Sequence, residues 1–149
     1  MIPLNPLLAP PARRWLLVDD NLEILSLMQE TVAQLFGVEA AAHHSPCEAL
    51  AAFQAAPEEF QIIITDLEMP VMDGFELCHR LLAIAPAAKV FLATGSHFVT
   101  RGEARARGFC GLLTKPFSPL TLQHEIAAVR FLTGHPAAMA EAAVQAWTN

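Results

Sequence analysis

Short apolar runs alternate along the chain with longer segments in which apolar residues recur every three or four positions. Four of the runs span residues 14–19, 60–65, 88–94 and 109–114, and a weaker, alanine-rich run spans 38–44. Near-continuous apolar runs of this length are typical of strands in a parallel sheet that is covered on both faces. The spacing in the intervening segments, such as 21–36, is that of amphipathic helices. The pattern therefore predicts five strands that alternate with five helices.

Local signals at the segment boundaries sharpen this prediction. Ser45, Pro46 and Glu48 form the start of a helix, since serine caps the first turn and proline and glutamate suit the positions that follow. Helices are likewise predicted after Asp73–Gly74 and over 118–132. The helix predicted over 96–108 has few apolar anchors beyond Phe98 and Val99, so we expect it to be the mobile element.

Strands that alternate with helices form parallel sheets with right-handed crossovers. The sequence therefore predicts an α/β protein, a flavodoxin-like (βα)5 doubly wound parallel sheet with strand order 2-1-3-4-5. The folded domain is expected over residues 13–132, between a Pro-rich N-terminal tail (1–12) and an Ala-rich C-terminal tail (133–149). Met139, Ala143 and Trp147 would share one face of a helix, so residues 137–147 form either a short extra helix or a frayed tail.

Polar residues follow the apolar runs where the predicted strands end. The residues are Asp19, Asp20, Asp66, Thr94 and Lys115. In an open α/β sheet these strand ends share one edge, where ligands bind. Three neighbouring carboxylates repel one another unless a cation compensates, and Mg²⁺ prefers such oxygen ligands. A carboxylate of this kind can attack phosphorus to form an acyl phosphate, whose oxygens an ammonium and a hydroxyl group can hold.

Charge and composition argue against several classes of binding partner and against membrane insertion. The net charge is −6 and the isoelectric point is near 5.4, which argues against direct binding of nucleic acid. No apolar run reaches the ~18 residues of a membrane span, and the N-terminus lacks the features of a signal peptide, so we expect no membrane insertion and a cytoplasmic location. Cys47, Cys78 and Cys110 are far apart and are interpreted as small buried apolar residues.

Four motifs at successive strand ends, "LLVDDN", "IIITDLEMPVMDG", "LATGS" and "LLTKPF", resemble those of a response-regulator receiver domain of two-component signalling. The likeness covers roughly residues 13–132 and is greatest to single-domain, chemotaxis-type regulators. It implies that Asp66 accepts a phosphoryl group from a phosphohistidine on a sensor histidine kinase or a histidine phosphotransfer protein. The phosphorylated domain would then act on an output protein that the sequence does not identify, and a homodimer is an open alternative.

The resemblance also implies a role for each site residue. Asp20, Asp66 and the backbone carbonyl of Glu68 would ligate Mg²⁺, and Asp19 would assist through water. Thr94 and Lys115 would hold the phosphoryl group. The Lys115–Pro116 peptide bond is often cis in the family.

Two positions leave alternatives open. Leu112 stands where the family usually has a switch aromatic residue, so it is either part of an altered switch or plain core. The resemblance implies that Glu68 and Ser96 occupy positions that, in the family, influence how long the phosphoryl group lasts, although Glu68 is equally a solvated loop residue. Among functions, a signalling module that catalyses only its own phosphorylation and dephosphorylation competes with two others. These are a phosphorylation-independent scaffold and an aspartate-nucleophile phosphatase, which usually has a second aspartate where this chain has Glu68.

Overall fold

The computed structural model describes residues 14–132. The tail expected over residues 1–12 and the extra helix expected over 137–147 lie outside the described residues. The elements are β1 (Arg14–Val18), α1 (Leu22–Phe36), β2 (Ala40–His43), α2 (Pro46–Ala55), a single 3-10 turn (Pro57–Glu59), β3 (Phe60–Asp66), α3 (Gly74–Ile84), β4 (Lys89–Thr94), α4 (Arg101–Ala106), β5 (Gly111–Thr114) and α5 (Pro119–Leu132).

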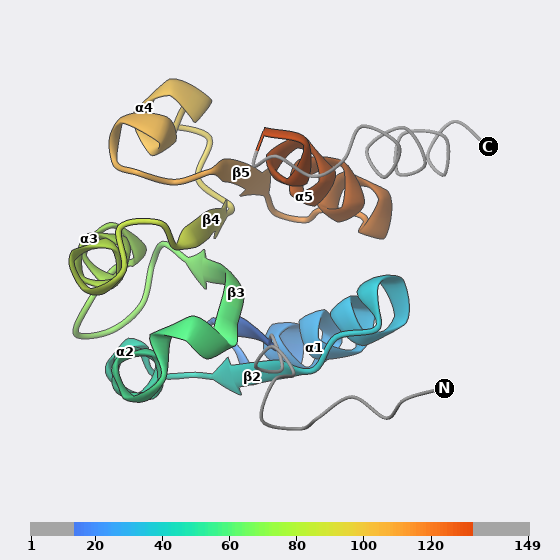
Figure 1. The fold of residues 1–149 in the computed structure, drawn as a ribbon. Coiled ribbons are helices and arrows are strands. Elements are labelled where there is room, and N and C mark those ends of the chain that lie inside the picture. Colours follow the sequence, from blue (N-terminus) through green and yellow to red (C-terminus); the bar gives the residue numbers. More distant parts are fainter. Residues whose placement is uncertain (1–13, 133–149) are drawn as a thin grey trace, which may run out of the picture.

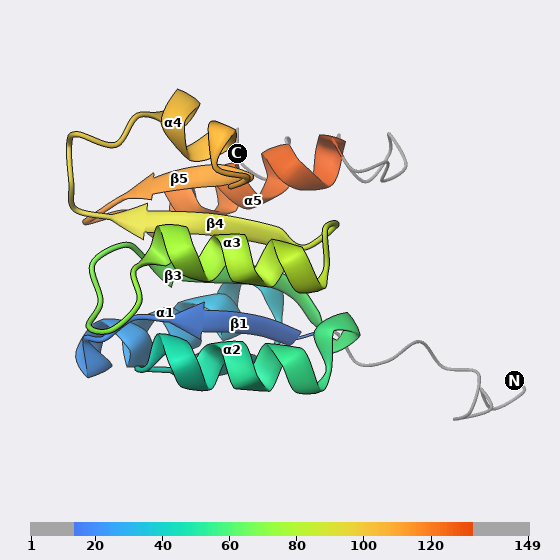
Figure 2. The ribbon, with the colours of Figure 1, turned by 90° about the vertical axis from the view of Figure 1, so that its left-hand side faces the viewer.

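All five strands are parallel and lie in the order β2-β1-β3-β4-β5, which confirms the predicted fold. Helices α1 and α5 cover one face of the sheet, and α2, α3 and α4 cover the other (Figure 1). In a view turned by 90°, the strand arrowheads point to the same side (Figure 2). The loops that follow the strands therefore gather at one edge of the sheet.

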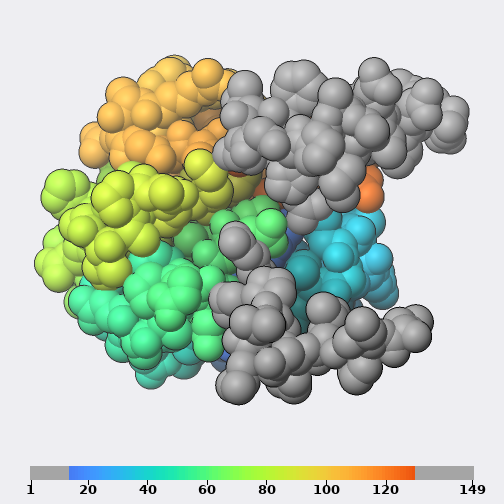
Figure 3. All heavy atoms as spheres, in the orientation of Figure 1, coloured from blue at the N-terminus to red at the C-terminus, as the bar shows by residue number. Residues whose placement is uncertain are grey.

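The apolar runs bury side chains on both faces, as the parallel sheet requires. Leu16 and Ile63 belong to a core cluster under α2, α3 and α4, whereas Trp15 and Ile64 belong to a second cluster under α1 and α5. The outer layer formed by α2, α3 and α4 is visible as a continuous surface in Figure 3. No helix of the described residues, 14–132, is long and apolar enough to cross a membrane.

Side-chain caps fix where the helices begin. The Asn21 carboxamide accepts hydrogen bonds from two backbone N–H groups of α1, and Ser45 and Asp73 accept one each at the starts of α2 and α3. These caps satisfy N–H groups that lack a partner within the helix. At the other end of α1, Gly37 takes a left-handed conformation with φ 63°. The caps at Ser45 and Asp73 confirm the predicted helix starts.

The helix predicted over 96–108 is shorter than expected. It spans only Arg101–Ala106, because the Thr100 hydroxyl caps it by accepting from the Glu103 N–H at 3.0 Å. Phe98 is no anchor, since 93% of it is exposed, whereas Ala104 is buried in the core. The interpretation of the cysteines was wrong for Cys47, which lies exposed in the first turn of α2.

Candidate functional site

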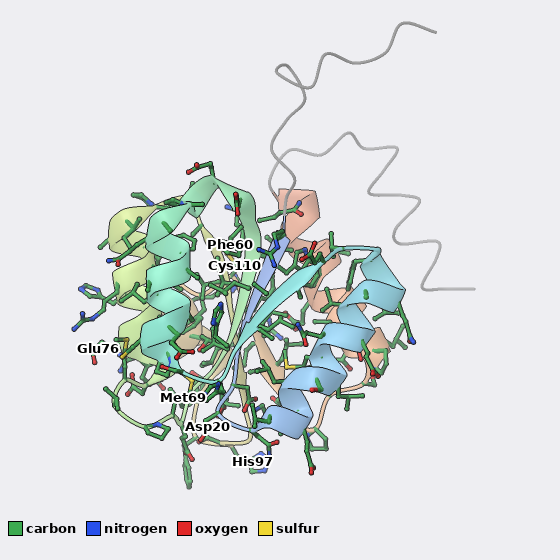
Figure 4. The ribbon with its side chains drawn as sticks, turned by 90° about the horizontal axis from the view of Figure 1, so that it is seen from below. Asp20, Phe60, Met69, Glu76, His97 and Cys110 are labelled. Carbon is green, nitrogen blue, oxygen red and sulfur yellow. The ribbon has the colours of Figure 1, made fainter. Side chains whose placement is uncertain are left out.

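A polar pocket of about 580 Å³ opens at the edge of the sheet where the strands end. All the predicted site residues line it: Asp19, Asp20, Asp66, Glu68, Thr94 and Lys115. Figure 4 shows Asp20, Met69 and His97 at this end of the molecule, and Phe60 and Cys110, which open or precede strands, away from it. The sheet topology thus brings together residues that are up to 96 positions apart in the sequence.

Three carboxylates form the acidic part of the pocket. Asp19, Asp20 and Asp66 each offer an oxygen, and these oxygens lie within 4.8 Å of one another. The three differ in burial: Asp19 is only 2% exposed, Asp66 is partly buried and Asp20 is exposed. Carboxylate oxygens that range from buried to exposed suit a hard divalent cation, because such an ion can bind them and still keep some of its water ligands.

Lys115 joins two of these carboxylates. Its Nζ donates to Asp19 Oδ2 at 2.6 Å and lies 3.2 Å from Asp66 Oδ1. Its backbone N–H donates to the Thr94 carbonyl at 2.9 Å, which ties the ends of β4 and β5 together. The Lys115–Pro116 bond is cis, as the resemblance implied.

Burial and charge shift the pKa values of this group in a consistent way. Burial raises the pKa of Asp66, and the charge of Asp19 adds to this, although Lys115 and the Leu67 N–H act in the opposite direction. Burial alone would lower the pKa of Lys115. The hydrogen bond to Asp19 and the negative charges of Asp19 and Asp66 outweigh this effect of burial, so the pKa of Lys115 is raised. The pocket therefore keeps its one ammonium charged while Asp66 is left short of compensating positive charge.

Backbone geometry places Asp66 at the pocket. A Cβ at Gly74 would lie 2.3 Å from the carbonyl oxygen of Asp66, so only glycine allows the first turn of α3 to approach the end of β3 this closely. The Gly74 N–H donates to the Leu67 carbonyl at 2.8 Å, which holds the two segments together. Gly74, which marked a helix start in the sequence, thus also fixes the position of the Asp66 strand end.

Thr94 connects the pocket to the loop that leads into α4. The side chain is 2% exposed, and its Oγ1 accepts a hydrogen bond from the Ser96 N–H at 3.0 Å. A hydroxyl group can accept one hydrogen bond and still donate another. Thr94 can therefore donate to a group in the pocket while it stays bonded to the loop.

Other pocket residues were not recognised from the sequence. Asn21, Ile24, Gly95, His97 and Phe98 also line the pocket. They lie one to four positions after Asp20 or Thr94, so their place in the strand-end loops was the available signal. Leu112 lies away from the pocket, half-buried against the core cluster under α2, α3 and α4, which leaves both interpretations of this residue open.

The comparison with protein families decides the identity. A family model described as the response regulator receiver domain matches residues 15–127. The chain belongs to the response regulator receiver family. Curated relatives agree with this: a response regulator receiver protein of Anaeromyxobacter sp. (strain Fw109-5) is 36% identical over 106 residues, which cover 70% of this chain and 43% of that protein. The transcriptional regulatory protein DctD of Rhizobium meliloti is 33% identical over 103 residues, covering 68% of this chain and 22% of that protein.

Solved receiver structures have the same fold. The chemotaxis protein CheY4 of Vibrio cholerae is 32% identical and superposes with a TM-score of 0.69 over 79% of this chain and 98% of that one. A CheY-like receiver domain protein of Methanospirillum hungatei is 25% identical, with a TM-score of 0.67 over 77% and 90% of the two chains. This receiver chain spans half or less of the length of the first curated relatives that it matches.

Proposed function

We propose that this receiver accepts a phosphoryl group on Asp66 from a phosphohistidine of a sensor kinase or a histidine phosphotransfer protein. The transfer depends on Mg²⁺, occurs in the cytoplasm and changes which protein the domain binds. The observation that carries the proposal is the position of Lys115, whose Nζ lies within 3.2 Å of Asp66 and 2.6 Å of Asp19. This ammonium is placed to bind the oxygens of a phosphoryl group as it arrives on Asp66.

The reaction is a substitution at phosphorus. A carboxylate oxygen of Asp66 forms the new P–O bond while the P–N bond to the donor imidazole breaks, and the imidazole leaves with the electron pair and takes up a proton. The product is an acyl phosphate, which water later hydrolyses to restore Asp66 and release inorganic phosphate. Apart from this turnover of its own phosphoryl group, the domain is proposed to catalyse no reaction.

The carboxylates fit a bound Mg²⁺. The oxygens of Asp19, Asp20 and Asp66 lie within 4.8 Å of one another, and exposed Glu68 lines the same pocket. Asp20 and Asp66, with the backbone carbonyl of Glu68, are the proposed ligands, and Asp19 is proposed to act through water. When bound, the ion supplies positive charge that offsets both the carboxylates and the phosphoryl oxygens. This role explains why one lysine suffices among three acids.

Thr94 is the proposed link between the phosphoryl group and the surface. Its hydroxyl would donate to a phosphoryl oxygen while the Ser96 N–H continues to donate to that hydroxyl. A shift of Thr94 toward the phosphoryl group would then move the loop over residues 95–100 and with it α4. The folded unit proposed for this switch is 13–132, with the two tails outside it.

Reaction with a small P–N donor tests this proposal. Phosphoramidate, like phosphohistidine, carries its phosphoryl group on nitrogen, and a Phos-tag gel separates phosphorylated from unmodified protein. We expect a Mg²⁺-dependent shifted band for the unmodified sequence and none for Asp66→Asn. Asp73→Asn, which changes an exposed aspartate outside the pocket, is the control and should shift as the unmodified chain does. A band that persists in Asp66→Asn would contradict the assignment of the acceptor.

The phosphorylation-independent scaffold makes a different prediction. Once an output protein has been isolated, its affinity should depend on phosphorylation if the proposal holds. Equal affinity for the unmodified chain and for Asp66→Asn, both treated with phosphoramidate and Mg²⁺, would favour the scaffold. The proposal predicts instead that treatment changes the affinity of the unmodified chain only.

A further inference from the structure

A second, apolar groove lies between α1 and α5. It has a volume of about 460 Å³ and opens beside the first half of α1 and the start of α5. Leu27, Met28, Phe117 and Leu122 contribute to its walls. The polar pocket has a different character, since carboxylates dominate its floor, although both hollows share Ile24 and Lys115. The groove is therefore a separate surface at the margin of the proposed phosphorylation site.

Apolar surface is left in water around this groove. Leu27 is 64% exposed although it forms one wall, and Leu120 in the first turn of α5 is 57% exposed. Each of these leucines forgoes part of the stabilisation that full burial would provide. An exposed apolar side chain in the wall of an apolar groove marks a place where something can pack.

The chain itself supplies a segment with matching chemistry. Beyond α5, Gly134 and Pro136 interrupt the sequence, and residues 137–147 follow with a high alanine content that favours a helix. Met139, Ala143 and Trp147 are spaced four apart, so they fall on one face of such a helix. An isolated helix of this length is marginal in water, so it needs a surface to pack against.

The length of the segment matches the distance back to the groove. Since α5 follows β5, it begins at the edge with the polar pocket and ends at Leu132 at the opposite edge. The path from Leu132 back to the level of Leu122 is about 15 Å along α5, and a helix over 137–147 is about 16 Å long. A helix that runs back antiparallel to α5 therefore brings Trp147 level with the groove.

We propose that residues 137–147 dock as a helix in the α1–α5 groove, with Trp147 packed against Leu27 and Phe117. A tethered segment binds at an effective concentration of the order of millimolar, so the chain's own C-terminal segment has an advantage over the same segment of a second copy. The docked helix covers the apolar surface at the margin of the polar pocket. This placement follows from the groove and the segment alone and does not depend on the phosphorylation of Asp66.

Fluorine NMR of the full chain labelled with 5-fluorotryptophan tests the docking. The chain contains two tryptophans, Trp15 and Trp147, and Trp15 is fully buried in the core. The Trp147→Phe variant assigns the second resonance. We expect the Trp147 resonance to lie away from its position in urea and to be shielded from solvent. Leu27→Glu should return it to the unfolded position while the Trp15 resonance stays unchanged, which shows that the domain remains folded.

Leu22→Glu is the matched control, because Leu22 lies on the same helix with nearly the same exposure and does not line the groove. This variant should leave both resonances in place. A Trp147 resonance at its unfolded position in the unmodified chain, or one that Leu27→Glu does not move, would overturn the proposal. A shielded resonance that appears only as protein concentration rises would also overturn it and would assign the groove to a second copy.

Discussion

Helices α1 and α4 both begin at the edge of the polar pocket, yet they are anchored very differently. Helix α1 has 15 residues, is capped by Asn21 and Gly37, and buries Leu25, Met28 and Val32. Helix α4 has six residues and buries only Ala104. Displacing α1 would expose three buried side chains, whereas displacing α4 would expose one. From this contrast we predict that α4 moves more readily than α1 when the pocket changes.

Hydrogen exchange should show the largest difference between the two helices. Local opening is easiest where few apolar contacts must be broken. We expect the amides of α4 to exchange at least about 100-fold faster than those in the middle of α1, which corresponds to roughly 3 kcal/mol in opening free energy. Exchange rates measured by NMR in the absence of Mg²⁺ give this ratio directly. Comparable rates in the two helices would remove the basis of the contrast.

Deletion of one anchor from each helix should change global stability unequally. Leu25→Ala removes a side chain that is 5% exposed, so the free energy of unfolding should fall by about 2–5 kcal/mol. Ala104→Gly removes a single methyl group from α4 and should cost about 1 kcal/mol. Urea denaturation measures both values. A larger loss for Ala104→Gly than for Leu25→Ala would mean that α4 is the better anchored helix.

A further effect concerns Asp66, in the pocket that both helices border. Its pKa is raised above 3.8, mainly by burial, so the folded chain holds the Asp66 proton more tightly than the unfolded chain does. The stability that this proton provides is complete below the unfolded pKa and is lost as the pH rises through the folded value. At neutral pH without Mg²⁺, Asp66→Asn should therefore raise the free energy of unfolding, by less than Leu25→Ala lowers it.

The check is urea denaturation of both chains at several pH values. The gain from Asp66→Asn should shrink as the pH falls through the raised pKa of folded Asp66 toward 3.8, and it should be absent below 3.8, where the unmodified side chain is neutral in both the folded and the unfolded chain. A gain that is independent of pH would show that charge is not its cause.

The smallest effect is expected at the ion pair that fastens α4 to α5. Arg101 contacts both carboxylate oxygens of Glu125, whose side chain is 13% exposed. Arg101→Ala should cost about 1 kcal/mol or less in global stability, but it should further speed hydrogen exchange in α4. Arg80→Ala is the control, since it breaks an exposed pair with Glu76 inside α3. If the two variants speed exchange in α4 equally, the Arg101–Glu125 pair does not restrain that helix.

The strength of each element also explains what the sequence could predict. Helix α1 was recognisable because its apolar residues repeat every three to four positions, and the helix starts at Ser45 and Asp73 were recognisable from side chains that bond to their own segment. The extent of α4 was predicted wrongly because its position depends on tertiary contacts. Ala104 is buried against the core, whereas Phe98, the stronger apolar signal, is exposed beside the polar pocket.

The features of the pocket likewise divide into those that the sequence could predict and those that it could not. Parallel topology is enough to place Asp19, Asp66, Thr94 and Lys115 at one edge, so the sequence predicted their proximity. The bond from Lys115 to Asp19 rather than to Asp66 alone depends on side-chain geometry at atomic scale. The position of His97 in the pocket wall depends on the path of a loop, which no periodic pattern describes.

The most direct test of the central claim is to locate the phosphoryl group in the chain. The full chain is incubated with acetyl phosphate and Mg²⁺, the acyl phosphate is trapped by reduction with borohydride, and the peptides are mapped by mass spectrometry. We predict modification of the peptide that contains Asp66 and of no other, with none in the absence of Mg²⁺. Modification at another carboxylate, or none on a chain treated alongside a receiver that does become labelled, would contradict the account.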